Sequence, residues 1–65
     1  MNKIAEVRNS IGITQSQLCK AIGWRQSRLS NYETGARQVS TENAKKITQA
    51  LNEFGASVNF EQVFP

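Results

Sequence analysis

Residues 14–35, TQSQLCKAIGWRQSRLSNYETG, predict two short helices, each of which is followed by a glycine. Thr14 is a favourable helix cap, and Gln17, three residues later, can reach back to it and complete a capping box. Gly23 and Gly35 suit the left-handed backbone conformation that chains often adopt just past a helix end. The stretch therefore predicts a tightly connected pair of helices, the second running from about Arg25 to Thr34.

The flanking segments predict further helices. Asn2 can cap a first helix, and Ser40 or Thr41 begins a fourth, the longest. The helical spacing places two sets of apolar side chains on inner faces: Ile4, Val7 and Ile11 in the first helix, and Ala44, Ile47, Ala50, Leu51 and Phe54 in the fourth.

The carboxyl end has two interpretations. Asn59 as a cap and Gln62 as its capping-box partner favour a short fifth helix with a staple between Val58 and Val63. Alternation at Val58, Phe60 and Phe64 leaves a strand as the alternative. The expected fold is all-α, a compact bundle of about five short helices in a single domain, residues 1–65.

Composition excludes several function classes. The chain has no histidine, one cysteine and five carboxylates, which do not provide the usual zinc spacings or a Ser/His or Cys/His catalytic arrangement. We expect no enzyme, no metal and no cofactor, and a packing role for the lone Cys19 between the paired helices.

The amino terminus lacks a signal-peptide core and no apolar run is long enough to span a membrane. A cytoplasmic protein is expected.

Charge is unevenly distributed along the chain. Residues 20–46 contain six lysines and arginines against two glutamates, a net charge of +4, whereas residues 47–65 have a net charge of −2. One end of the molecule should therefore attract polyanions while the other should not.

The helix after Gly23 has two different faces at 100° per residue. Leu29 and Tyr32 form the inner one, and Trp24, at the turn, is expected to plug the core. The outer face is a stripe of short donors and acceptors without a carboxylate: Gln26, Ser27, Ser30 and Asn31. A stripe that served solubility alone would favour Glu and Lys.

Amide side chains can pair bidentately with adenine in the major groove, and arginine can do so with guanine. Gln26, Ser27 and Asn31 are therefore expected to face bases, with Ser30 in the same stripe. Arg25, at the start of the helix, could reach a base or a phosphate. Arg28 lies off the stripe and is expected to contact a phosphate or to be solvated.

Residues 14–35 resemble the helix-turn-helix of the Xre family, which includes phage Cro proteins and lambda-type repressors. The family pattern falls on Gln15, Cys19, Gly23 and Leu29, and the resemblance covers most of the chain. Two departures are Arg25, where the family often has a Ser or Thr cap, and residues 52–54, which lengthen the fourth helix.

The resemblance also implies roles for individual residues. Gln15 would meet a DNA phosphate and brace Gln26, and Arg8 and Glu33 would form a largely buried salt bridge. Thr34 and Arg37 match the family's loop that contacts the DNA backbone.

The expected function is that of a Cro-like repressor, because 65 residues leave no room to bind an inducer or to be cleaved. It would bind a pseudo-palindromic operator in double-stranded DNA as a homodimer, weakly associated without DNA. The alternative is a DNA-binding antitoxin with a toxin partner, or another protein-interaction module. The expected dimer surface is the apolar carboxyl end: Phe54, Val58, Phe60, Val63 and Phe64.

Overall fold

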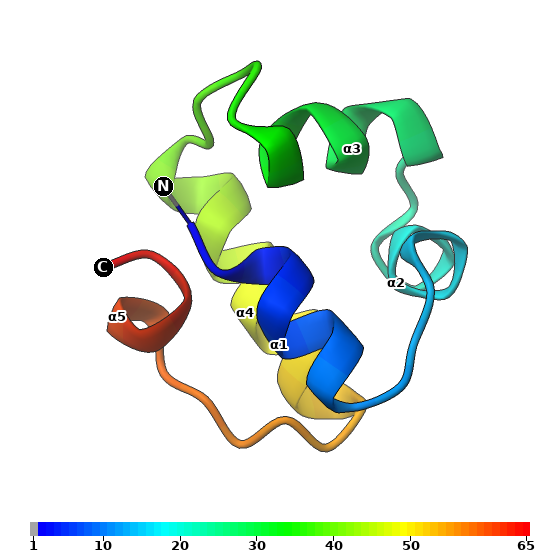
Figure 1. Ribbon diagram of the computed structural model, residues 1–65, viewed down its shortest axis with the longest axis vertical. Coiled ribbons are helices and arrows are strands. Elements are labelled where there is room, and N and C mark those ends of the chain that lie inside the picture. The colour runs from blue at the N-terminus through cyan, green and yellow to red at the C-terminus, as the bar shows by residue number, and fades with distance from the viewer. Residues whose placement is uncertain (1) are drawn as a thin grey trace.

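The computed structural model describes residues 2–65, and over this range the chain forms five helices and no strand (Figure 1). The predicted all-α bundle is thereby confirmed. None of these helices is long and apolar enough to cross a membrane. The elements are α1 (Ile4–Ser10), α2 (Gln15–Ile22), α3 (Gln26–Thr34), α4 (Thr41–Glu53) and α5 (Phe60–Val63).

The ends of α2 follow the local sequence. Thr14 Oγ1 accepts a hydrogen bond from the Gln17 backbone N–H at 3.0 Å, and Gln17 Oε1 accepts from the Thr14 N–H at 2.8 Å. The helix stops at Gly23, whose φ of 88° is left-handed. A Cβ built on Gly23 would meet no atom within 4 Å, so backbone conformation rather than crowding favours glycine here.

The start of α1 differs from the prediction. Lys3, not Asn2, is the residue that precedes the helix, and its side chain makes no capping bond. Asn2 Oδ1 accepts from the Ile4 backbone N–H at 3.1 Å, while Asn2 Nδ2 donates to the Tyr32 carbonyl at 2.8 Å. Asn2 therefore joins the beginning of α1 to α3, a long-range role that the local cap pattern does not reveal.

The carboxyl segment forms the predicted fifth helix, and the strand alternative is wrong. Asn59 and Gln62 make both bonds of the capping box, at 2.8 and 2.9 Å. Because the Lys3 N–H donates to the Val63 carbonyl at 2.7 Å, α5 closes against the start of the chain, as the blue and red ends of the ribbon show (Figure 1).

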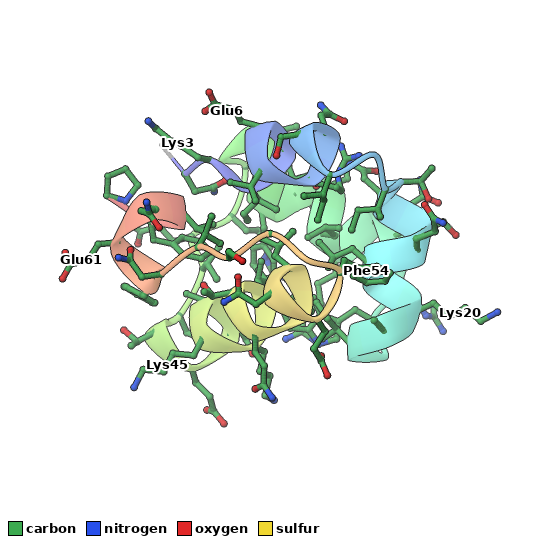
Figure 2. The ribbon with its side chains drawn as sticks, turned by 90° about the horizontal axis from the view of Figure 1, so that it is seen from below. Lys3, Glu6, Lys20, Lys45, Phe54 and Glu61 are labelled. Carbon is green, nitrogen blue, oxygen red and sulfur yellow. The ribbon has the colours of Figure 1, made fainter. Side chains whose placement is uncertain are left out.

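The core is assembled around α4, which contacts α1, α2 and α5. The sequence places Ala44, Ile47, Ala50 and Leu51 on its inner face, and all four are buried. Phe54 was expected in the same stripe, but that prediction is wrong, because its side chain is 39 % exposed. It follows the last residue of α4, where the chain turns back toward α5 (Figure 2). The largest fully buried side chains are Ile4, Leu18, Leu29, Ile47, Leu51 and Val63.

Candidate nucleic-acid interface

The α2–α3 pair is held together by buried side chains from both helices. Leu18 and Cys19 of α2 pack in the same cluster as Leu29 and Tyr32 of α3. The Cys19 thiol donates to the Arg25 carbonyl at 3.6 Å, and burial raises the pKa of this thiol. The predicted packing role of Cys19 is confirmed, and the pair presents the outer face of α3 from a fixed base.

The polar stripe of α3 lies at the surface, opposite the buried Leu29. Gln26, Ser27 and Asn31 are exposed and Ser30 is half-buried. Arg25 precedes α3 with an extended backbone, and its side chain makes no capping bond, so the helix start lacks the side-chain cap that a serine or threonine would supply. The exposed Arg25 guanidinium makes no hydrogen bond within residues 2–65, so it can contact another molecule.

A bidentate ion pair joins α1 to the end of α3, as the family resemblance implies. Arg8 Nε lies 2.9 Å from Glu33 Oε2, and Arg8 Nη2 donates to Glu33 Oε1 at 3.1 Å. The two side chains are only 12 % and 5 % exposed. Arg8 Nη1 also donates to the Ile13 carbonyl at 2.9 Å, so this arginine ties α3 to the α1–α2 connection as well.

Two glutamines extend this ion pair to the polar stripe. Gln15 Nε2 donates to Glu33 Oε1 at 2.9 Å, and Gln26 Nε2 donates to Gln15 Oε1 at 3.3 Å. Gln26 is thus the exposed end of a chain of side chains whose other end is Arg8. Within residues 2–65, Gln26 Oε1 has no recorded partner, so it and the second amide hydrogen can contact another molecule.

The start of α3 carries an aromatic cluster that sequence reasoning missed. Trp24 is half-buried and packs against the core, as expected, and its ring also contacts Arg28 and Tyr32. The Arg28 guanidinium carbon lies 4.2 Å from the centroid of the Trp24 ring, and Tyr32 meets Trp24 edge-on with ring centroids 5.6 Å apart. Arg28 is therefore stacked and half-buried rather than fully solvated.

Tyr32 connects this cluster to α4. Arg28 Nε donates to Tyr32 Oη at 3.3 Å and Asn43 Nδ2 donates to the same oxygen at 3.5 Å. The hydrogen bond from Arg28 is the main reason that the pKa of Tyr32 is lowered. A sequence signal for the cluster existed, because Arg28 and Tyr32 are four residues apart and share a side of the helix.

The basic side chains of residues 20–46 lie on several parts of the surface, and Lys46, for example, lines a hollow with Ala21 and Ile22 of α2. Arg25, Arg28 and Arg37 line one surface hollow of about 390 Å³, together with Ser27 and Asn31. Lys45 lines a separate groove of about 470 Å³ between α4 and α5, which also contains Glu53 and Phe60. The positive charge beside the polar stripe is thus carried by arginines, and the fourth helix contributes a surface of mixed charge.

The loop after α3 and the expected dimer surface complete the set of predicted residues. Thr34 and Arg37 are exposed, and the Thr34 hydroxyl donates to the Asn31 carbonyl at 3.4 Å. Val63 was expected in a dimer interface, but it is fully buried in the chain's own core, so that assignment is wrong. Of the remaining interface candidates, Phe54 is exposed and three are half-buried: Val58, Phe60 and Phe64.

Comparison with known proteins is informative at the family level. Searches of curated proteins and of solved structures give no match. Within residues 2–65, no group of three His, Cys, Asp or Glu side chains could hold a metal ion. A family model described as helix-turn-helix matches residues 4–53, which include α1 to α4. The chain therefore belongs to this helix-turn-helix family of Xre and lambda-repressor-like DNA-binding domains.

Proposed function

We propose that this protein is a Cro-like, sequence-specific repressor that reads double-stranded DNA in the major groove with α3. The observation that carries the proposal is the hydrogen bond between Gln26 and Gln15, which is anchored through Glu33 on the buried Arg8 ion pair. A side chain whose position is fixed before binding loses less conformational entropy when it pairs with a base.

The chemistry available at Gln26 suits adenine. One Nε2 hydrogen is occupied by Gln15, and the other can be donated to adenine N7. Gln26 Oε1 can accept from the adenine N6 amino group at the same time, which completes a bidentate pair. The Gln15 amide would stay close to the neighbouring phosphate, as the family resemblance implies.

The other predicted contacts divide into base and backbone classes. Ser27 and Asn31, exposed on the same face of α3, would contact base edges next to Gln26, with Ser30 at the margin. Arg25 would reach a base or a phosphate from the start of the helix. Thr34 and Arg37 in the following loop would contact the DNA backbone and position the domain without reading sequence.

The proposed repressor acts as a twofold dimer. Recognition helices in successive major grooves are about 34 Å apart, whereas the Cα positions of one domain span only 26 × 24 × 18 Å. Two copies side by side would therefore be needed. The exposed Phe54 and the half-buried Val58, Phe60 and Phe64 supply apolar surface for the contact, and binding would repress by occupying the operator.

Selection of binding sites from random duplex DNA tests this function. The expected result is enrichment of a pseudo-palindrome with half-site centres about 10 base pairs apart. Enrichment of a lone half-site bound by one monomer would contradict the dimer, and failure to enrich any sequence would contradict base readout.

A further inference from the structure

The helix α3 has two flanks, and Gln15, which is bonded to Gln26, lies beside only one of them. Counted at 100° per residue, Gln26 lies at one edge of the polar stripe and Arg28 lies about 200° away, beyond the other edge. An α-helix with its side chains is about 10–12 Å wide and the major groove is about 12 Å wide. A helix seated in the groove therefore has a phosphate backbone beside each flank.

Side-chain contacts also hold the flank of α3 that carries Arg28. The guanidinium carbon of Arg28 lies 4.2 Å from the Trp24 ring centroid and 5.9 Å from that of Tyr32. Arg28 Nε is occupied by Tyr32 Oη, whereas the two Nη atoms have no recorded hydrogen-bond partner within residues 2–65. The stack thus fixes the plane of the guanidinium and leaves its terminal donors available.

The surroundings of Arg28 favour an anion. The hollow of about 390 Å³ beside it is also lined by Arg25 and Arg37, and no carboxylate lines it. Ser27 and Asn31, which belong to the polar stripe, also line it. The hollow therefore begins at the edge of the surface that faces bases in the proposed complex.

We propose that this hollow is a binding site for one backbone phosphate of the duplex, with Arg28 as its central donor. The inference rests on the proposed DNA-binding function and adds a contact on the flank of α3 opposite Gln15. The phosphate oxygens would accept hydrogen bonds from the Arg28 Nη atoms, while Arg25 and Arg37 contribute positive charge from the sides.

Arginine is specifically suited to this position. Its planar guanidinium can stack on Trp24 and still present paired donors to a phosphate, whereas a lysine ammonium is a point charge on a flexible stem. Lysine at position 28 would keep the charge but lose the fixed plane. Removing the charge at position 28 should change the number of phosphates neutralised. Replacing arginine by lysine should change only the affinity at a given salt concentration.

The test measures binding of the full chain to a random-sequence duplex by anisotropy of a dye on the DNA, over a series of salt concentrations. A random duplex is used because the proposed contact carries no sequence information. The variants are Arg28→Ala, Arg28→Lys and, as the matched control, Lys45→Gln, which removes one positive charge from the separate α4–α5 groove. Circular dichroism verifies that each variant is folded.

Arg28→Ala is expected to reduce the slope of log K against log salt by about 0.9, the value for one phosphate. Arg28→Lys is expected to keep the slope but to bind about 2- to 10-fold more weakly, because a flexible ammonium must be immobilised on binding and cannot present the paired donors of the guanidinium. Lys45→Gln should leave the slope unchanged.

A folded Arg28→Ala with the wild-type slope would overturn the phosphate site while leaving the proposed function intact. Full affinity in Arg28→Lys would overturn the role of the stack. A wild-type protein that binds neither random nor selected duplex would overturn the site and the proposed function together.

Discussion

At the scale of single residues, the orientation of Gln26 depends on an ion pair that it does not touch. Glu33 receives hydrogen bonds from both Arg8 and Gln15, so its carboxylate links the α1–α3 contact to the polar stripe. The prediction from sequence that these residues cooperate came from the family resemblance, because Arg8 and Glu33 are far apart in the chain. The distances now give that link a physical basis.

Glu33→Gln should destabilise the fold strongly. Both partners of the ion pair are almost entirely buried, and removing one of them strands the Arg8 charge at a cost of about 3–5 kcal/mol. A core of this size supplies only ~3–5 kcal/mol in all, so the variant should be largely unfolded at room temperature. Thermal and urea unfolding measure the effect, with the exposed Glu6→Gln as the control (Figure 2). Equal melting temperatures for wild type and Glu33→Gln would contradict the prediction.

The pKa of Tyr32, the single tyrosine, reports on the contacts within the aromatic cluster. The hydrogen bond from Arg28 favours the phenolate and lowers the pKa of Tyr32, so Arg28→Ala should raise this pKa toward its ordinary value. Absorbance titration of the phenol measures the midpoint, and Arg25→Ala should leave it in place.

This lowered pKa favours the folded state only at alkaline pH. The contribution is present above the unfolded pKa of about 10 and is lost as the pH falls through the folded value, so it adds nothing at neutral pH. An unchanged midpoint in Arg28→Ala would show that the Arg28–Tyr32 hydrogen bond does not form in solution.

At the scale of elements, the carboxyl segment is fastened by one side chain of α4. Asn52 Nδ2 donates to the Val58 carbonyl and Asn52 Oδ1 accepts from the Val58 N–H, both at 2.7 Å. The last turn of α4, which contains Asn52, therefore supplies the residue that holds the approach to α5. Ser57, just before Val58, has a left-handed φ of 55°, as a tight turn in this connection requires.

Asn52→Ala should loosen α5 without unfolding the bundle. Two surface hydrogen bonds contribute about 1–2 kcal/mol in all, since water can replace part of the loss. Because the Lys3 N–H is bonded to the Val63 carbonyl, its hydrogen exchange should become faster in the variant. Gln49→Ala, another exposed amide on α4, is the control and should leave that exchange rate unchanged. Equal protection of Lys3 in wild type and Asn52→Ala would contradict the fastening role.

Local patterns predicted the elements, and long-range contacts explain the exceptions. The capping boxes at Thr14 and Asn59 depend on residues three positions apart, so sequence alone could identify them. Asn2 Oδ1 accepts from the Ile4 N–H, as a cap does, but Asn2 Nδ2 donates to the Tyr32 carbonyl, a contact that is distant in sequence and that the local pattern could not predict. Phe54 has the spacing of the inner stripe, but the spacing does not reveal that α4 ends at Glu53 and that the side chain remains exposed.

At the scale of the whole molecule, charge is arranged differently from its order in the sequence. The arginines around α3 gather beside the polar stripe, whereas Lys45 lies with Glu53 in the α4–α5 groove. Lys20 on α2 and Glu61 on α5 project from opposite sides of the bundle (Figure 2). The surfaces proposed for DNA and for the dimer are therefore separate at Phe60, which lines the α4–α5 groove, and they meet at Phe64, which lines a hollow together with Arg37.

Phe54→Gln should weaken dimerisation while leaving the monomer folded. The side chain is the exposed large apolar group of the described chain, so replacing it removes surface from an interface without opening a cavity. Sedimentation with operator duplex should give two copies of the wild type per site and fewer of the variant. Deleting residues 56–65 would be a poorer test, because Val63 is a core residue. Wild type bound as one copy would contradict the dimer and would leave the Phe54 surface for a partner protein, as in the antitoxin alternative.

The candidate site shows the same division between local and spatial information. The residue types and periodicity of α3 were enough to predict an exposed stripe at Gln26, Ser27 and Asn31. The stack at Arg28 could be predicted in part, because Trp24, Arg28 and Tyr32 follow one another at intervals of four residues, but the sequence does not show that the guanidinium lies over the Trp24 ring. Val63 was misjudged because an apolar residue near a chain end can cover either its own core or a partner.

The most direct measurement of the central claim is the affinity of Gln26→Ala for a selected operator and for a random duplex, beside the same pair of values for Arg37→Ala. Base readout by Gln26 predicts a loss of about 1–3 kcal/mol on the operator and almost none on random DNA. Arg37→Ala, a backbone contact in this scheme, should lose affinity nearly equally on both. Equal losses on the two duplexes for Gln26→Ala, or a wild type that does not distinguish them, would contradict the claim that α3 reads sequence through Gln26.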